Sequence, residues 1–290
     1  MNNKKKVAIV VLSLLVLIIF VFLSKIYTSK GFLKANNLDE KDSQVWEFTD
    51  EGIIKGAEGF TIEGTSETCW TLVHGYTSTP PVYKTLAKEI NKKFNDTVYV
   101  PRLKGHGMLP SNILQYNIED WYNEIENTNC DYMVGSSMMA ALTLKYAEEH
   151  DPKKVVVIGT YIKAPTTLGS PFFINIAHTL RKFSYKNTVG TIDDPEGRKV
   201  HIATWGFPLK EVVNFHKNYE KEITKNAKNI KAEILFIHAS KDTVASLDLA
   251  KEVYNNIQSK KKFVETKGNH LILRDYDKDK AIEEILNFRN

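Results

Sequence analysis

The sequence predicts an α/β fold in which a mostly parallel central sheet is covered by helices on both faces. Short apolar runs rich in β-branched residues end in turn residues, and most are followed by a stretch of helical periodicity. An apolar segment near the N-terminus further predicts that one transmembrane helix precedes this domain.

The apolar segment occupies residues 7–23, where every residue except Ser13 is apolar. This length is close to the minimum for a helix that crosses a bilayer. Lysines 4–6 precede it, which favours a short cytoplasmic N-terminus (1–6) and an extracytoplasmic domain. A cleaved signal peptide is the alternative, but the run is long for one and no small-x-small cleavage site follows. We therefore expect a single-pass protein of the cell membrane.

Residues 24–44 are polar and lysine-rich without sustained periodicity, which predicts a juxtamembrane spacer. The folded domain is expected over residues 45–290. The formal net charge of +4 arises from 39 Lys and Arg against 35 Asp and Glu, and the basic residues form no stripe or arginine cluster. Binding to a nucleic-acid backbone requires such a concentration of basic residues. We expect no nucleic-acid partner.

Five short apolar runs predict the buried strands of the sheet. They are Thr71–Val73, Thr97–Val100, Tyr132–Val134, Val155–Ile158 and Ile234–Ile237. Helical periodicity predicts helices at Val82–Phe94, Met138–His150 and Leu247–Asn256. This alternation is typical of parallel sheets that are buried on both faces.

The alternation fails between residues 161 and 229. Aromatic residues mix there with turn residues before a helical pattern resumes up to Lys228. An insertion of this size usually lies over the carboxyl ends of the strands, where open α/β sheets bind ligands. We interpret residues 161–229 as a cap.

A strand-to-helix junction carries the candidate nucleophile, Ser137. A serine on a strained turn of this kind projects its hydroxyl above the sheet. Gly135, two positions earlier, removes a Cβ that would collide with the turn, whereas Ser136 would have Val134 at the corresponding position. Because Gly-Ser-Ser alone is also typical of a helix N-cap, the assignment depends on further motifs.

Five motifs together resemble the bacterial carboxylesterase and monoacylglycerol lipase branch of the α/β-hydrolase family, over most of residues 51–290. Besides the Ser137 junction they are Leu72-Val73-His74-Gly75-Tyr76-Thr77, Pro101-Arg102-Leu103-Lys104-Gly105-His106-Gly107, Ile237-His238-Ala239-Ser240-Lys241-Asp242 and Lys267-Gly268-Asn269-His270-Leu271. The resemblance implies an α/β-hydrolase fold and a serine hydrolase that cleaves carboxylic esters.

The resemblance also implies a role for each site residue. Ser137 is the nucleophile, His270 the base that takes its proton, and Asp242 the carboxylate that orients this base. The order Ser, Asp, His along the chain is the one this fold uses. The backbone N–H groups of Tyr76 and Met138 are assigned to the oxyanion hole.

Alternatives remain open at several of these positions. Asp242 could merely cap a turn, in which case Asp248 is the substitute acid. Met139 departs from the family pattern, which has a small residue there, although Ala140-Ala141 could supply room. Met139 motivates a catalytically silent, surface-anchored binding domain as an alternative. A serine peptidase or a thioesterase would use the same triad.

Two cysteines, Cys69 and Cys130, lie five residues before His74 and Gly135 respectively. In the family's sheet the two strands are parallel neighbours, which would place the two Cα atoms about 5 Å apart, within reach of a disulfide. A disulfide fits an extracytoplasmic domain, and two buried thiols fit equally well.

The remaining histidines suggest no further chemistry. His74 is expected to brace the oxyanion loop, and His106 to lie near the cleft without reacting. Because no pair of histidines has the spacing of metal ligands, we expect neither a metal nor another cofactor. The Phe and Trp residues of the cap suit an acyl chain better than a charged substrate, which favours a lipid or short-chain ester as substrate.

Overall fold

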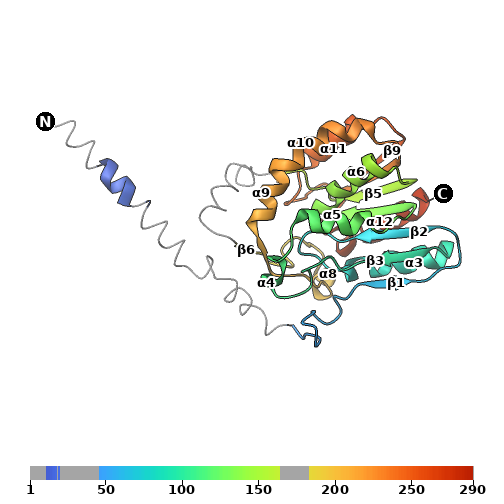
Figure 1. The fold of residues 1–290 in the computed structure, drawn as a ribbon, viewed down its shortest axis with the longest axis horizontal. Coiled ribbons are helices and arrows are strands. Elements are labelled where there is room, and N and C mark those ends of the chain that lie inside the picture. Colours follow the sequence, from blue (N-terminus) through green and yellow to red (C-terminus); the bar gives the residue numbers. More distant parts are fainter. Residues whose placement is uncertain (1–10, 18, 20–45, 164–182, 290) are drawn as a thin grey trace.

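The computed structural model describes residues 11–17, 19, 46–163 and 183–289. A seven-stranded sheet forms the centre of the folded domain (Figure 1). Its first strand pairs antiparallel to its neighbour, and all other pairs are parallel. In spatial order the strands are β1 (Phe60–Ile62), β3 (Thr97–Val100), β2 (Cys69–Val73), β4 (Tyr132–Ser136), β5 (Lys154–Ile158), β8 (Glu233–Ala239) and β9 (Lys261–Thr266).

Helices cover both faces of this sheet, as predicted. The apolar side chains of each buried strand alternate between two cores: Val155 and Val157 belong to one, Val156 and Ile158 to the other. The first core contains residues of α5 (Ile118–Glu126), α6 (Met138–His150) and α11 (Leu247–Asn256). The second contains residues of α3 (Lys84–Phe94) and α12 (Lys278–Phe288).

All five predicted strands are present, each extended by up to three residues. The predicted helices at 138–150 and 247–256 have the predicted bounds. The helix predicted from Val82 begins later, because the 3₁₀ helix η3 (Pro80–Tyr83) precedes α3. The two edge strands β1 and β9 and the helices α5 and α12 were not predicted from the sequence.

The described part of the cap contains a small antiparallel pair, β6 (Phe183–Tyr185) and β7 (Gly206–Pro208). Its helices are α8 (Pro195–Lys199), α9 (Leu209–Asn218), α10 (Glu220–Asn226) and the 3₁₀ turn η5 (Ala227–Asn229). Residues 164–182 of the predicted cap lie outside the described residues. Cap residues line the same cavity as residues at the carboxyl ends of the central strands, which fits the predicted position of the cap.

The N-terminal prediction falls mostly on residues that are not described. Of the predicted anchor, 7–23, the structure describes only 11–17 and 19, which are helical. The predicted spacer, 24–44, lies outside the described residues altogether. Within the described part of the chain, no helix combines the length and the apolar character needed to span a bilayer.

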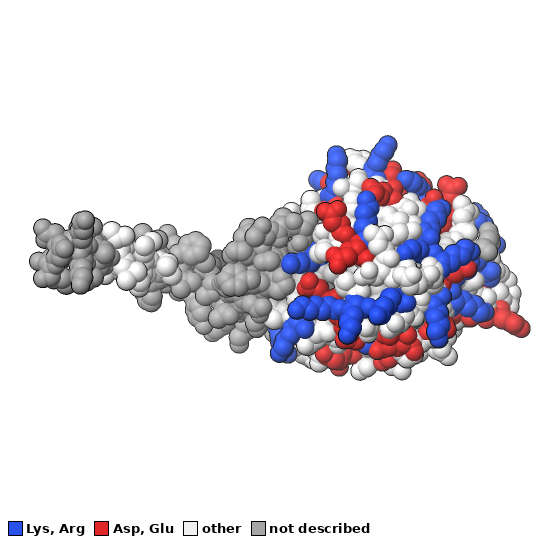
Figure 2. Space-filling model, turned by 90° about the horizontal axis from the view of Figure 1, so that it is seen from above, with Lys and Arg blue, Asp and Glu red and all other residues white. Residues whose placement is uncertain are grey.

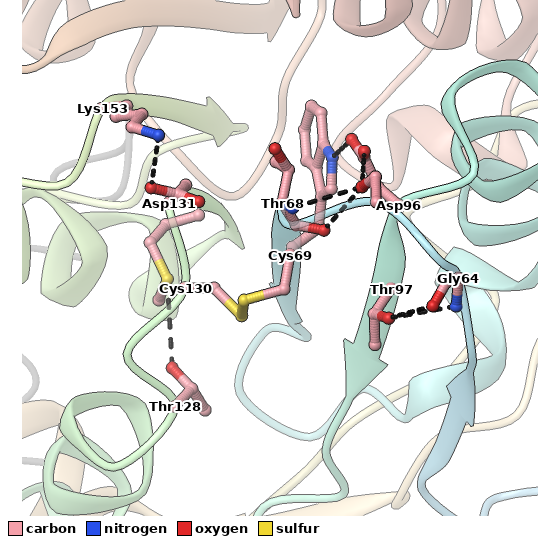
Figure 3. The surroundings of a disulfide bond; sticks show 12 residues. Gly64, Thr68, Cys69, Asp96, Thr97, Thr128, Cys130, Asp131 and Lys153 are labelled. Atoms are coloured by element: carbon pink, nitrogen blue, oxygen red, sulfur yellow. Dashed lines mark hydrogen bonds and ion pairs between the residues drawn. A yellow bond between two sulfur atoms is a disulfide. The ribbon is translucent and has the colours of Figure 1, made fainter.

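The amino ends of β2 and β4 are joined by a disulfide between Cys69 and Cys130 (Figure 3). Their Cα atoms are 5.1 Å apart, close to the separation expected for neighbouring parallel strands. Beside the disulfide, Lys153 forms an ion pair of 2.9 Å with Asp131. Of the two states that the sequence left open, the structure contains the disulfide.

Charged side chains of both signs are interspersed on the face of the domain shown in Figure 2. Several form exposed pairs, such as Lys199 with Glu196 at 2.6 Å and Lys251 with Glu265 at 2.6 Å. Exposed pairs of this kind each contribute about 0–1 kcal/mol to stability. The fold therefore depends on its two apolar cores rather than on these pairs.

Candidate active site

Ser137 occupies a strained turn between β4 and α6. Its φ of 58° and ψ of −128° lie in a region that a residue with a Cβ rarely adopts. The turn is held by a hydrogen bond of 2.9 Å from the Ser137 N–H to the carbonyl of Ile158. A Cβ at Gly135 would lie 2.3 Å from Thr143 Oγ1 and 2.8 Å from the carbonyl oxygen of Met139. Glycine is therefore required there, as the sequence analysis argued.

The three residues predicted to form a relay lie together. Ser137 Oγ is 2.9 Å from His270 Nε2, and His270 Nδ1 is 2.8 Å from Asp242 Oδ2. The side chain of Asp242 is fully buried and that of His270 is 4% exposed. With the carboxylate accepting from Nδ1–H, the imidazole keeps Nε2 free to accept the hydroxyl proton.

The loop after β8 holds Asp242 as an ionised acceptor. Its second oxygen, Oδ1, accepts hydrogen bonds from the N–H groups of Val244 at 2.8 Å and Ala245 at 2.7 Å. Burial acts to raise the pKa of Asp242, but the interaction with His270 and the remaining hydrogen bonds outweigh it and leave this pKa below its usual value. Asp248, the substitute acid, is instead exposed in the first turn of α11.

Asn269 fixes the two loops of the relay to each other. Its side-chain oxygen accepts from the His270 N–H at 2.8 Å and from the Thr243 N–H at 3.0 Å. Its own N–H donates to Asp275 at 2.7 Å. This positioning role was not predicted from the sequence, although Asn269 lies directly before His270 in the Lys-Gly-Asn-His motif and could have indicated it.

A further histidine, His238, lies against the carboxylate of Asp242. Its Nε2 is 3.5 Å from Asp242 Oδ2 and 3.3 Å from the carbonyl oxygen of Ala245. Burial lowers the pKa of His238 despite the neighbouring carboxylate. This neutral imidazole extends the polar surroundings of Asp242, and the sequence analysis quoted it only as part of a motif.

The end of β2 approaches the serine turn closely. A Cβ at Gly75 would lie 2.9 Å from Ser137 Cβ, so only glycine permits this approach. The next residue, Tyr76, lines the same cavity as Ser137 and Met138. The two residues assigned to the oxyanion hole thus line the cavity together with the serine.

His74 braces this loop, as predicted. Its Nε2 accepts the Leu103 N–H at 3.1 Å, so its Nδ1 carries the proton and donates to the Gly75 carbonyl at 3.1 Å. Burial lowers the pKa of His74 to about 4, which keeps it neutral. His106 is fully buried beside it, and burial lowers the pKa of His106 well below its usual value.

A cavity of about 520 Å³ opens at Ser137 and His270. Cap residues give it an apolar wall that includes Phe207, Leu209 and Val212. Among the described residues that line it, Lys186 is the only Lys or Arg, and none is Asp or Glu. The cavity can therefore take an apolar chain next to a nucleophilic hydroxyl.

The sequence matches the family model described as "Serine aminopeptidase, S33" over residues 66–277. The chain belongs to this family of α/β hydrolases. It is 26% identical to a thermostable monoacylglycerol lipase of Bacillus sp. (strain H-257), across 81% of this chain and 95% of the relative. It is 23% identical to a carboxylesterase of Bacillus subtilis (strain 168), across 73% of this chain and 76% of the relative.

Solved structures support the fold of this hydrolase. A structure of metagenome-derived lipolytic enzymes aligns with a TM-score of 0.72 at 21% identity. That alignment covers 81% of this chain and 98% of the other. The chain is thus an α/β hydrolase that is similar to lipases and esterases, as the five sequence motifs predicted.

Met139, the departure from the family pattern, does not displace the serine turn of this hydrolase. Its side chain is fully buried in the core that contains α6, together with Ala140 and Ala141. The hydrogen bond between Ser137 and His270 is in place beside it.

Outside the residues that line the cavity, three side chains form a cluster of the residue types that ligate metal ions. Glu126, Glu149 and His150 bring three ligand atoms within 4.8 Å of one another, where α5 and α6 end. These groups already have protein partners, because His150 pairs with Glu126 at 2.9 Å and Tyr122 donates to Glu149. We assign no metal to this cluster.

Proposed function

We propose that this protein is a membrane-anchored serine hydrolase that cleaves carboxylic esters through an acyl-enzyme on Ser137. The observation that carries the proposal is the unbroken chain of hydrogen bonds from Ser137 through His270 to Asp242, at the wall of a partly apolar cavity. A hydroxyl needs such a base, and the base needs such a carboxylate, to become a nucleophile at neutral pH.

In the proposed reaction His270 Nε2 takes the proton of Ser137 as Oγ bonds to the ester carbonyl carbon. The oxygen of the resulting tetrahedral intermediate is stabilised by the N–H groups of Tyr76 and Met138, and one such donor is typically worth roughly 3 kcal/mol. The C–O bond to the alcohol then breaks, and the alcohol leaves with the proton from His270. Water attacks the acyl-enzyme by the same steps and releases the carboxylic acid.

The cavity supports an ester with an acyl chain as the substrate. Phe207, Leu209 and Val212 offer apolar surface near Ser137, and burying each CH₂ group contributes about 0.8 kcal/mol. The relatives named monoacylglycerol lipase and carboxylesterase act on the same chemical class. We therefore propose lipid or short-chain carboxylic esters as substrates.

The family description makes an aminopeptidase the natural alternative. Such an enzyme must hold the positively charged amino group of a peptide, for which a carboxylate is the usual partner. The described residues that line the cavity include no Asp or Glu, and Lys186 would repel that amino group. These charges favour ester hydrolysis over aminopeptidase activity. A thioesterase would use the same parts.

We propose that residues 7–23 anchor the enzyme in the cell membrane with the catalytic domain outside the cytoplasm. The apolar segment behind three lysines supports the anchor, and the disulfide between Cys69 and Cys130 supports an oxidising compartment. Alkaline carbonate extraction of cells tests the anchor. The full-length chain should remain in the membrane pellet, and its release into the supernatant would contradict the proposal.

Fluorophosphonate labelling of the purified full-length chain tests the serine mechanism. We expect wild type to be labelled and Ser137→Ala to be unlabelled, because the phosphonate bonds to an activated serine oxygen. Ser136→Ala is the matched control and should still be labelled. p-Nitrophenyl esters of increasing acyl length should then be cleaved, and aminoacyl p-nitroanilides should not. Labelling that persists in Ser137→Ala, or folded wild type without labelling, would refute the mechanism.

A further inference from the structure

Lys186 presents a positive charge to the catalytic cavity without a carboxylate partner among the described residues. It lies one residue beyond β6 in the cap, is half-buried and lines the cavity together with Ser137. Its Nζ donates a hydrogen bond of 2.7 Å to the neutral Oγ1 of Thr77. No Asp or Glu among the described residues forms an ion pair with it, and desolvation alone shifts its pKa, to about 8.

The part of the cap outside the described residues offers no carboxylate either, because residues 164–182 contain no Asp or Glu. Two other cap lysines do have acidic neighbours. Lys199 lies 2.6 Å from Glu196, and Lys210 lies 3.7 Å from Glu211. Among the described residues, the half-buried Lys186 is thus unpaired, whereas the exposed Lys199 and Lys210 are paired. An unpaired charge costs more free energy when it is removed from water, so the pairing is the reverse of what stability alone would favour.

Two other basic side chains have a buried nitrogen atom without a hydrogen-bond partner among the described residues. His201 is buried, and its Nε2 has no hydrogen-bond partner among the described residues. Nε of Arg274 has none either, although another nitrogen of its guanidinium donates to the carbonyl oxygen of Pro81. Burial, together with the positive charges of Lys186 and Arg274, lowers the pKa of His201 to about 3. His201 is therefore neutral, and Lys186 is the only Lys or Arg that the described lining of the cavity presents to a ligand.

We propose that Lys186 binds an anionic group, a carboxylate or a phosphate, carried by the ester substrate, so that the enzyme prefers anionic esters to neutral ones. This inference rests on the proposed ester hydrolysis at Ser137. An ammonium group has three N–H donors. Thr77 accepts one of them, which leaves donors for a ligand. Because Thr77 follows Tyr76, the anion would bind beside the oxyanion hole.

The test compares neutral and anionic esters on the full-length chain. Phenyl butyrate is the neutral ester, 4-carboxyphenyl butyrate carries the anion on the alcohol side, and monophenyl glutarate carries it on the acyl side. Each kcat/KM is divided by the rate constant of the same ester with hydroxide, which removes differences in leaving group. The measured quantity is the ratio of anionic to neutral kcat/KM, and the ester with the raised ratio identifies the side that carries the anion.

In Lys186→Met this ratio should fall at least about tenfold, the usual worth of a hydrogen bond to a charged group. Lys186→Arg should retain most of the preference, because it keeps the charge. Lys217→Met is the matched control, since Lys217 is an exposed lysine on α9 of the cap, and its ratio should equal that of wild type. A ratio unchanged in Lys186→Met would overturn the inference.

The pH dependence separates binding from a purely structural role of Lys186. Lysine is charged below its pKa and neutral above it, so the wild-type preference should be present below pH 8 and be lost as pH rises through about 8. The preference of Lys186→Arg should persist to higher pH, because arginine stays charged. If Lys186 only holds Thr77 in place, its loss will change both esters equally and leave the ratio flat, which also overturns the inference.

Failure of the proposed function is distinguishable from failure of this inference. If fluorophosphonate labels Ser137 but no ester is cleaved, ester hydrolysis is wrong. Competition with labelling then decides the inference. At equal concentration 4-hydroxybenzoate should slow the labelling of wild type more than phenol does, and this difference should vanish in Lys186→Met. Equal slowing by both compounds in wild type would overturn the inference.

Discussion

Buried polar groups at the two ends of the parallel strands differ in whether they have hydrogen-bond partners within the chain. At the amino ends, the buried carboxylate of Asp96 accepts hydrogen bonds from Trp70 at 2.8 Å, from Ser66 at 2.5 Å and from Arg289 at 3.2 Å. The disulfide between Cys69 and Cys130 joins two strands at this same end. Every group named here has its partner within the chain, and each contact stabilises the fold.

At the carboxyl ends, several buried polar groups lack such partners among the described residues. They include Nε2 of His201, Nε of Arg274 and Oγ1 of Thr160 and Thr191. The turn at Ser137 is also strained there. Unsatisfied groups and strain reduce stability, so their concentration at one end indicates that a ligand completes this end. The groups that stabilise the fold thus lie at the amino ends of the parallel strands, and the candidate active site lies at their carboxyl ends. Substitutions at one end should change stability, and substitutions at the other should change activity.

Among the substitutions proposed, Asp242→Asn should have the largest effect, and it should act on catalytic activity. The amide would donate to His270 Nδ1 instead of accepting from it, so the proton would move to Nε2 and the imidazole could no longer accept from Ser137. We expect kcat to fall about 10⁴-fold, with a much smaller change in unfolding free energy. Steady-state hydrolysis of p-nitrophenyl butyrate and urea unfolding measure the two quantities.

Asp248→Asn is the control for this substitution, because Asp248 is exposed on α11 and was the substitute acid in the sequence analysis. Its kcat should stay within about twofold of wild type, as for most exposed substitutions. The assignment of Asp242 is wrong if the control loses activity while Asp242→Asn keeps it.

The sequence predicted the residues of the relay because each lies in a local pattern. Ser137, Asp242 and His270 each lie in a loop or turn that directly follows a strand, in a motif of residues contiguous in sequence. In an α/β fold the loops that follow parallel strands all lie at the carboxyl ends of the sheet. Lys186 could not be predicted in the same way. Its segment has no periodicity, and its place in the cavity depends on contact with Thr77, 109 residues away.

The fold was predictable to the extent that strands are buried on both faces. The five predicted strands are continuous apolar runs, whereas β9 reads Lys-Lys-Phe-Val-Glu-Thr and alternates buried with exposed residues at the sheet edge. The edge strand β1 has only three residues. The helix α5 did carry a usable signal, because Asn117 and Asp120 form a capping box at its start.

The next largest effect is expected at the amino ends of the strands, where the free energy of unfolding should change rather than the activity. Replacing both Cys69 and Cys130 by alanine frees a loop of 61 residues in the unfolded chain, which corresponds to about 4 kcal/mol by chain entropy. Urea unfolding should report this loss, while kcat/KM of the folded variant should stay within about twofold. Dithiothreitol should destabilise wild type and leave the double variant unchanged. Equal stability of oxidised and reduced wild type would contradict the role given to the disulfide.

Asp96→Asn should give the smallest of the three effects and is the strictest test of the comparison, since it removes one charge without emptying the site. The amide NH₂ would face N–H and O–H donors of Trp70, Ser66 and Arg289, so at least one donor would lose its acceptor. We expect about 1–3 kcal/mol of lost stability and unchanged kcat/KM.

Asp131→Asn is the matched control for Asp96→Asn. It lies at the same edge, but its ion pair with Lys153 is solvent-exposed, with side chains that are 29% and 66% accessible. Such a pair is worth at most about 1 kcal/mol. If the two substitutions lower the free energy of unfolding equally, burial of the Asp96 network does not matter, and the contrast between the two ends of the strands is wrong. If Asp96→Asn instead lowers kcat/KM in the folded protein, the amino edge is coupled to the site, and stability and function are not separated across the sheet.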